Sequence, residues 1–273
     1  MAVINTNVAA TLTANAMAQN ERASTQALER LSTGLKINSA ADDAAGMAMS
    51  NTMTAQVRGL DMAVKNANDA ISMIQTADGA SIEIGDMLQR MRELGVQAVN
   101  GTLTDADRTQ LDLEYQQLIT EIGRVGDNTQ WNGTNLIDDS AGSSGTVTYQ
   151  IGDTAQTMTV DFGDLSDDGD LGLTGDITDM TNAAAAILDV DVAIVALNTQ
   201  RATYGAAINR LEHTVDNLSN VSMNTQAALS RIQDADYAAE TTELSRTQIV
   251  AQAGTAMLAQ ANQQAQSVLA LLK

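Results

Sequence analysis

Apolar residues recur at alternating spacings of four and three along most of the second half of the chain. On an α-helix this spacing lines them up along one side, and a stripe kept over many turns is typical of helices that pack as a coiled coil. We therefore predict a helix that continues to about Leu229, roughly 40 residues and about 60 Å long. Arg201 is the one charged member of the stripe. The stripe is formed by Val190, Ile194, Leu197, Arg201, Tyr204, Ile208, Leu211, Val215 and Leu218.

Two similar stripes occur in the first half of the chain and predict two more helices. One runs from Val57 to Ala98 with a phase slip near Asp78, and the other begins after Thr104. Thr104 stands three residues before Asp107, which is the spacing of a helix-capping pair. Ordinary amphipathic helices in a bundle would show the same pattern, but helices of this length favour a rod. The first stripe is formed by Val57, Leu60, Val64, Ala67, Ile71, Ile74, Ile84, Leu88, Met91, Gly95 and Ala98, and the second by Leu111, Tyr115, Leu118, Ile122 and Val125.

The two ends of the chain predict another pair of helices, whose stripes are made largely of small residues and are interrupted by Asn7, Glu21 and Ser24. Burying a Leu fully contributes about 1.5–3 kcal/mol and burying an Ala far less, so this pair gains little by closing on itself. Isolated helices also gain little from propensity alone. We expect the pair to be marginal, even disordered, in a monomer and to need neighbouring chains. The positions expected to pack are Val3, Ala10, Met17, Leu28, Leu31 and Leu35 in the first helix, and Leu244, Ala251, Leu258, Ala261, Ala265, Val268 and Leu272 in the second.

Residues 138–180 break the helical pattern and are rich in Gly, Asp, Ser and Thr. They hold the one clear two-residue alternation, which predicts a β-hairpin with one apolar face. Because the stripes lie elsewhere, we expect a surface module, such that replacing residues 141–176 by a Gly/Ser linker leaves a helical protein. The predicted fold is mainly α: a long antiparallel coiled-coil-like helical rod built from both halves of the chain, with a small central β-hairpin region. The alternating residues are Val147, Tyr149 and Ile151, then Met158, Val160 and Phe162.

The composition narrows the possible functions. The chain has no Pro, which permits long uninterrupted helices, and no Cys, which excludes disulfides and thiolate sites. Its net charge of −20 disfavours binding to nucleic acid or to an anionic membrane. Much of this acidity is central: 13 Asp and no Lys or Arg lie between Arg124 and Arg201. No stretch approaches the roughly 18 uninterrupted apolar residues of a membrane span.

Candidate catalytic and metal-binding chemistry is sparse. His213 is the single histidine, lacks an HExxH setting and is better interpreted as a solvated or interface residue than as a ligand or base. Asp164, Ser166, Asp168 and Gly169 copy the opening of a calcium-binding EF-hand loop, but the twelfth position is Gly175, where a bidentate Glu is needed, so a solvated acidic loop is favoured. No nucleophile–base pair or phosphate-binding loop occurs. We predict no enzyme, no cofactor and no bound metal.

The terminal sequences resemble those of a known family. LSTGLKINSAADDAAGMAMS at residues 31–50 is similar to the N-terminal signature of bacterial flagellins, and residues 232–272, which begin IQDADYAAETTELSRTQIVAQ, resemble their C-terminal counterpart. The likeness extends over residues 1–137 and 181–273. Ala41 stands where relatives often have a basic residue and Ala265 where many have proline, which leaves local packing open at these two positions.

The resemblance implies a structural subunit that self-assembles into the flagellar filament for swimming. It implies export, unfolded, through the flagellar type III apparatus to the extracellular flagellum. That replaces the cytosolic location otherwise suggested by an N-terminus with no basic residue before Arg22. The implied partners are further copies of the chain, an export chaperone, and cap and junction proteins, with no nucleic acid and no membrane. A hook–filament junction or hook-associated protein is the alternative.

The resemblance also implies a layered domain organisation and one receptor contact. Residues 1–45 with 230–273 would form the filament core, residues 46–137 with 181–229 the helical rod, and residues 138–180 a short acidic variable region facing outward. Residues matching Arg90, Leu94 and Glu114 contact a Toll-like receptor in related flagellins, so that role is carried over to them here. We expect these three to lie beside the rod stripes, on the surface.

Overall fold

A computed structural model describes residues 7–166 and 169–270, and of residues 264–270 it describes the backbone alone. The chain divides into two compact units, one of Met1–Ala55 with Asn224–Lys273 and the other of Gln56–Met223. Each unit is therefore built from both halves of the chain. The smaller contains the two terminal helices, and the larger contains the central region with most of the three remaining helices, two of which extend into the smaller unit.

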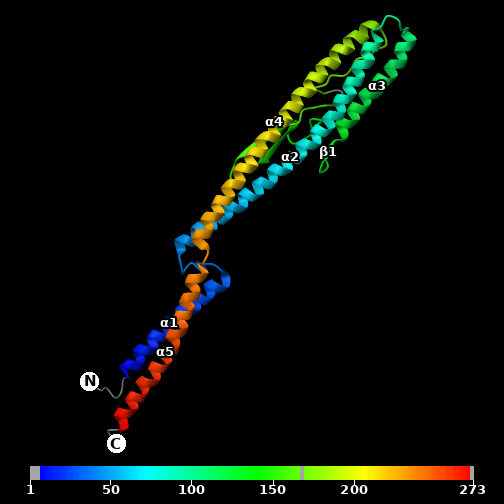
Figure 1. Cartoon of the computed structure of the whole chain (residues 1–273). Coiled ribbons are helices and arrows are strands. Elements are labelled where there is room, and N and C mark those ends of the chain that lie inside the picture. Colours follow the sequence, from blue (N-terminus) through cyan, green and yellow to red (C-terminus); the bar gives the residue numbers. More distant parts are fainter. Residues whose placement is uncertain (1–6, 167–168, 271–273) are drawn as a thin grey trace. The chain divides into compact units, whose positions relative to one another are not determined.

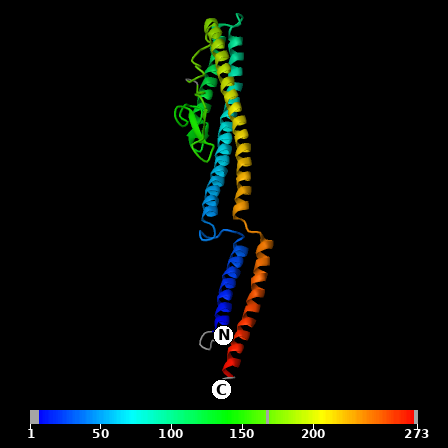
Figure 2. The same cartoon turned by 90° about the vertical axis from the view of Figure 1, so that its left-hand side faces the viewer.

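Three helices dominate the larger unit: α2 at Ala44–Ala98, α3 at Asp105–Asn128 and α4 at Met180–Gln233. Figures 1 and 2 show α2 and α4 side by side along this unit, with α3 beside the upper part of α2. Side-chain contacts show that α2 and α4 are antiparallel, because residues later in α2 contact residues earlier in α4. The mainly α, antiparallel rod predicted from the stripes is confirmed. These contacts join Asp61 to Ser222 at 2.9 Å, Asp78 to Arg201 at 2.9 Å and Arg92 to Asp191 at 2.7 Å.

The predicted stripes are the faces that α2, α3 and α4 turn toward one another, and all their members are buried or half-buried. Helix α4 nevertheless begins ten residues before Val190, the first residue of its stripe. The Asp179 carboxylate caps it by accepting hydrogen bonds from the backbone N–H of Thr181 and Asn182. Ala183 and Ala186 then continue its buried face, and alanine is too weak a signal to extend an apolar stripe.

The start of α3 confirms the predicted capping pair. Thr104 and Asp107 form a reciprocal capping box, in which each side chain accepts the backbone N–H of the other residue. One turn later, the nearly buried guanidinium of Arg108 donates to the carbonyl oxygens of Ala98 at 2.8 Å and Asn100 at 3.2 Å. Arg108 thus satisfies carbonyls that the end of α2 would otherwise leave unpaired.

The central region forms the predicted hairpin, from β3 at Thr146–Gln150 and β4 at Thr157–Asp161. The strands are antiparallel, with Val147 opposite Val160 and Tyr149 opposite Met158. A second, unpredicted hairpin joins β1 at Gln130–Trp131 to β2 at Thr134–Asn135. Its two-residue turn, Asn132–Gly133, has positive φ at both positions, as Asn-Gly turns do.

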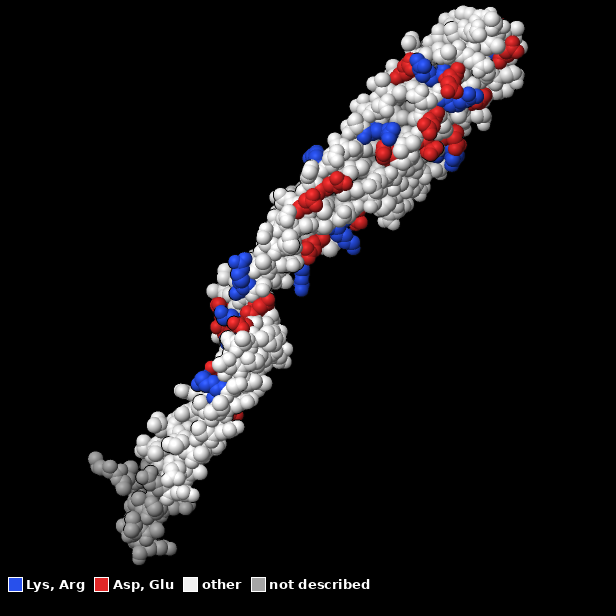
Figure 3. Space-filling model, in the orientation of Figure 1, with Lys and Arg blue, Asp and Glu red and all other residues white. Residues whose placement is uncertain are grey.

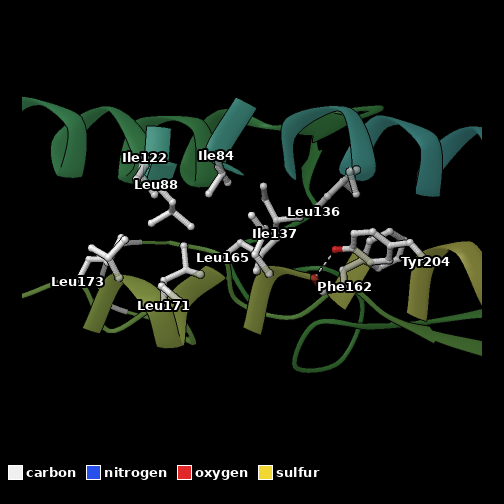
Figure 4. Close-up of a cluster of buried hydrophobic side chains, with 14 of the residues drawn as sticks. Ile84, Leu88, Ile122, Leu136, Ile137, Phe162, Leu165, Leu171, Leu173 and Tyr204 are labelled. Atoms are coloured by element: carbon white, nitrogen blue, oxygen red, sulfur yellow. Dashed lines mark hydrogen bonds between the residues drawn. The ribbon is translucent and has the colours of Figure 1, made fainter. Parts of the chain in front are cut away.

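The expectation that the central region is a separate surface module is wrong. Its apolar side chains are buried in the same core as α2, α3 and α4, and Figure 4 shows several of them between the helices. Tyr204 of α4 donates a hydrogen bond to the carbonyl oxygen of Phe162 at 2.5 Å, and the two rings lie 5.8 Å apart. The central region thus completes the core that the three helices form. Its contributed residues are Ala141, Met158, Val160, Phe162, Leu165, Leu171, Leu173 and Ile177, and Leu136 and Ile137 just before the region join the same core.

Three tyrosines in this core predict a loss of stability in alkali. Burial raises the pKa of Tyr115 to about 12 and raises those of Tyr149 and Tyr204 well above the usual value. In the unfolded chain they would ionise near pH 10, as tyrosines do. Stability from the neutral phenols is therefore present below about pH 10 and lost as pH rises through the folded values.

We expect the urea midpoint of the larger unit to be level from pH 8 to 9.5 and to fall by pH 11. Absorbance at 295 nm should report the additional phenolate only as the unit unfolds. The Tyr204→Phe variant, which cannot ionise at this position, should show a smaller fall. A midpoint for the unsubstituted chain that is the same at pH 8 and pH 11 would contradict the prediction.

Candidate functional site in the paired terminal helices

The main part of the smaller unit is an antiparallel pair of helices, α1 at Val8–Thr33 and α5 at Tyr237–Ala270. Asn7 caps α1, because its side-chain oxygen accepts the backbone N–H of Ala10, while its amide nitrogen donates to the carbonyl oxygen of Ala261 at 3.2 Å. Asn7, which interrupts the apolar stripe in the sequence, therefore links the two helices by a hydrogen bond.

Two further polar contacts fix the pair's register. The buried Asn20 amide donates to the carbonyl oxygen of Thr247 at 2.7 Å, and Arg30 pairs with Glu240 at 3.0 Å. Helix α1 ends at Gly34, whose backbone is in the left-handed conformation. Just beyond it, Leu35 forms an antiparallel β-bridge with Asp234, which lies before the start of α5. Sequence reasoning missed Asn20, because one Asn among many polar helix residues carries no distinguishing signal.

The pair buries very little of itself. In α1 only Asn20 and Ala27 are buried, and among the described side chains of α5 only Thr247 is. Gly254 allows a close approach, since a Cβ there would lie 2.9 Å from the Met17 side chain. One pair of helices with such a small shared face gains little from closing.

The predicted packing positions are covered only in part. Leu28 is 54% exposed, so it lies on the open side of α1. Val3 and Leu272 lie outside the described residues, as do the side chains of Ala265 and Val268. Whether these positions pack in an assembly stays a prediction. The half-buried ones are Ala10, Met17, Leu31, Leu35, Leu244, Ala251, Leu258 and Ala261.

Large apolar side chains lie uncovered on both helices. Apart from Leu28, which is a predicted packing position, they fall outside the small-residue stripes, and their placement off those stripes is itself a sign that one partner does not cover them. Monomeric proteins seldom expose many such residues together, and faces that do are interaction surfaces. The uncovered residues are Val8, Leu12, Leu28, Tyr237, Ile249, Val250 and Met257.

The pair is also almost free of charge toward the chain ends. No Asp, Glu, Lys or Arg occurs before Glu21, or between Arg246 and Lys273, in a chain whose net charge is −20. The face of α1 and α5 drawn in Figure 3 is correspondingly white toward these ends. Two such strongly acidic chains would repel each other elsewhere, so an uncharged apolar face is the one best suited to contact between copies.

The second candidate group, Arg90, Leu94 and Glu114, is divided by the structure. Arg90 of α2 and Glu114 of α3 are exposed and joined by an ion pair of 2.7 Å, and Arg90 also pairs with Glu93 at 3.0 Å. The hydrogen bond to Glu114 raises the pKa of Arg90. Leu94, in contrast, is 1% exposed and belongs to the core, so the expectation that it lies on the surface is wrong.

The position of Leu94 follows from the number of neighbours of α2. A stripe at spacings of four and three describes contact with one partner helix. Helix α2 packs against both α3 and α4, through Arg90 to Glu114 on one side and Arg92 to Asp191 on the other. More of its circumference is therefore buried than one stripe predicts.

The remaining candidates stand apart from one another. His213 is exposed on α4. The Asp164 carboxylate accepts hydrogen bonds from the backbone N–H and hydroxyl of Ser166, as in a local turn, while Asp168 lies outside the described residues. Within the described part of the chain, no three Asp, Glu or His side chains are grouped so as to hold a metal ion.

Comparison with known proteins gives two matches that cover most of the chain. Residues 4–142 match the family model of the bacterial flagellin N-terminal helical region, and residues 187–272 match that of the C-terminal helical region. A flagellin of Halalkalibacterium halodurans is 48% identical over 99% of this chain and 100% of its own length. A flagellin of Bacillus subtilis is 43% identical over 99% of both chains.

Solved structures agree with these matches. The crystal structure of Bacillus cereus flagellin is 36% identical and aligns with a TM-score of 0.50, over 60% of this chain and 94% of its own. A putative flagellar hook-associated protein from Vibrio parahaemolyticus aligns with a TM-score of 0.59 over 71% of this chain and 100% of its own, but at 13% identity. That second likeness shows a shared fold alone.

Proposed function

Because the chain belongs to the bacterial flagellins, we propose that its paired terminal helices form the inner, assembly-competent layer of the filament. As a member of that family the chain is a structural subunit of the extracellular flagellar filament, a homopolymer that serves motility, and is not an enzyme. A hook-associated role is not favoured, because the relatives that match nearly the whole chain at high identity are flagellins.

The observation that carries the proposal is that α1 and α5 leave large apolar side chains uncovered and carry no charge toward the chain ends. Residues 1–45 with 230–273 would form the filament core, where each helix pair is surrounded by pairs from other copies. Large apolar residues such as Leu12, Ile249 and Met257 would then be buried between copies, each contributing about 1.5–3 kcal/mol when fully covered.

The other domains would form the outer layers. Residues 46–137 with 181–229 would form the helical rod, and residues 138–180 the acidic outward face of that rod. The acidity supports this placement, since carboxylates are best solvated on the outside of a polymer. Because the central region shares its core with the helices, it would form one folded body with the rod in the filament.

Export and its partners follow from the same features. We propose passage through the flagellar type III apparatus in an unfolded state, with an export chaperone before secretion and cap and junction proteins at the filament. Terminal helices that bury little alone would stay open for a chaperone and would not assemble early, because they order fully only among neighbouring copies.

Seeded growth tests the proposed assembly. Purified chain added to short filament fragments should extend them into long helical tubes visible by electron microscopy, whereas a junction protein would stop after one layer. Failure to extend fragments made from the same chain would contradict the assembly proposal.

We further propose that the surface around Arg90 and Glu114 contacts a Toll-like receptor, with Leu94 contributing only as the core residue beneath it. Charge-assisted hydrogen bonds from Arg90 to a receptor carboxylate would replace its pairs with Glu93 and Glu114.

Replacing both exposed partners, Arg90→Ala with Glu114→Ala, should weaken binding of the soluble receptor ectodomain by about tenfold or more, because centrally placed Arg contacts dominate interfaces. Titration of the monomer by surface plasmon resonance measures this. The control, Arg124→Ala, removes an exposed Arg of α3 that is paired with Glu121 and should leave affinity unchanged. Equal affinity of the double variant and the unsubstituted chain would contradict the receptor contact.

A further inference from the structure

Methionine supplies all the sulfur of this chain, which has 13 Met and no Cys. Oxidants that attack sulfur can therefore act only on thioethers, which they convert to methionine sulfoxide. This reaction replaces a flexible apolar side chain by a polar one, disrupts surfaces that depend on Met, and is reversed by methionine sulfoxide reductases. The effect of oxidation on the chain depends on where each thioether lies.

The core methionines of the larger unit are shielded from solvent. Met73, Met91 and Met158 are at most 8% exposed and belong to the core that the helices share with the central region. In the terminal pair, by contrast, Met257 of α5 is 63% exposed and Met17 of α1 is half-buried. Because susceptibility follows exposure, a dissolved oxidant reaches the terminal pair before it reaches the core.

Met17 lies at a close contact between the two terminal helices. A Cβ added at Gly254 would stand 2.9 Å from Cγ and 3.4 Å from Sδ of Met17, so the thioether lies against α5 where that helix has no side chain. An oxygen atom bonded to this sulfur would need space in the contact or would force the side chain to turn out of it. Oxidation of Met17 would thus remove the close approach that Gly254 permits.

Met257 lies in the uncharged part of the same helix. It stands three residues after Gly254, within the segment between Arg246 and Lys273 that has no charged residue. Met257 is also one of the large apolar residues that the proposed assembly would bury between copies. A sulfoxide oxygen buried there would lose its hydrogen bonds to water, which costs free energy unless a new donor replaces them.

We propose that Met17 and Met257 form an oxidation-sensitive site that controls whether the free chain can assemble. The inference rests on the proposed assembly function and adds a regulation to it. The reactant is a peroxide: the Met sulfur attacks one peroxide oxygen, an S–O bond forms and the O–O bond breaks. The sulfur is oxidised to the sulfoxide and the peroxide is reduced. The second oxygen leaves as hydroxide, which takes up the proton of the S–OH group to give water.

Hydrogen peroxide added to the purified monomer tests the site. Peptide mass spectrometry should show Met17 and Met257 each gaining one oxygen atom at least about tenfold faster than the three buried core methionines. The treated chain should keep the urea transition of the larger unit but extend filament fragments at least about tenfold more slowly, and methionine sulfoxide reductases should restore its growth. Undiminished growth of a chain in which Met17 and Met257 are both sulfoxides would overturn the proposal.

Substitution identifies the residues responsible. The Met17→Leu, Met257→Leu variant keeps apolar side chains of similar volume that cannot form a sulfoxide, so peroxide should leave its growth rate unchanged. The matched control, Met62→Leu with Met180→Leu, removes two exposed thioethers of the larger unit and should stay as sensitive as the unsubstituted chain. Equal sensitivity of the Met17, Met257 variant and the unsubstituted chain would overturn the proposal. If the untreated, unsubstituted chain itself fails to extend fragments, the assembly function fails, and this inference with it.

Discussion

Deleting residues 141–176 and joining the ends with a Gly/Ser linker is expected to abolish the cooperative unfolding transition of the larger unit. The deletion removes Phe162, Leu165, Leu171 and Leu173, all of which are nearly fully buried, and uncovers Tyr204 on α4. Truncating one large core side chain costs about 2–5 kcal/mol, and a whole domain is stable by only about 5–15 kcal/mol. The loss of several such side chains at once exceeds what the helices alone can supply.

Thermal unfolding followed by circular dichroism measures this effect. The deleted chain should show a broad, non-cooperative loss of helix at a much lower temperature than the intact chain. Replacing the exposed strand residues Thr148 and Thr159 by Ala is the matched control, because it alters the same hairpin without touching its buried face. Unfolding of the deleted chain at the temperature of the intact chain would show that the central region is, after all, a separable module.

Removing residues 252–273 is expected to abolish filament growth while leaving the larger unit folded. The deletion takes away the uncharged half of α5, including the contact of Ala261 with Asn7, and the exposed Met257. The larger unit has its own core, to which the described side chains of α5 contribute none, so its unfolding midpoint should not change. The expected result is zero elongation of filament seeds with an unchanged urea transition.

The control for this truncation keeps the length of α5. Arg246→Ala removes an exposed pair with Glu243 and no apolar contact, so this variant should extend seeds at the rate of the unsubstituted chain. Growth of the truncated chain at that same rate would show that the C-terminal half of α5 is not required for assembly.

The sequence predicts the helices well where large apolar residues mark the contacts. The stripes from Val57 to Ala98 and from Val190 to Leu218 are the buried faces of α2 and α4. Prediction fails where the contact is made by alanine, as at Ala183 and Ala186, because a methyl group is equally common on exposed helix surfaces.

The burial of the central region and of Leu94 could not be predicted from spacing. A local pattern shows which face of a segment is apolar, but not which distant segment covers it. The alternation of apolar and polar residues predicts the central hairpin. The surface that its apolar face covers, however, is formed only when α2, α3 and α4 pack together. Leu94 falls outside one stripe because α3 covers a second side of α2.

In the terminal pair α1 and α5, the weakness of the apolar stripes is itself informative. Small interrupted stripes, with Leu12 and Ile249 off the stripe and no charge toward the ends, indicate a surface that one chain leaves incomplete. Asn20, which fixes the register through Thr247, adds specificity and little burial energy. The pair is therefore suited to neighbours more than to independent stability.

The claim that α1 and α5 become stable only among neighbouring copies is tested most directly by hydrogen exchange measured on monomer and on filament. In the monomer, backbone amides of α1 and α5 should exchange rapidly, because the pair opens at little cost, while those of α2, α3 and α4 in the larger unit stay protected. In the filament, α1 and α5 should become protected as strongly as the larger unit. Strong protection of both terminal helices in the monomer would contradict the account, because the pair would then be stable without neighbouring copies.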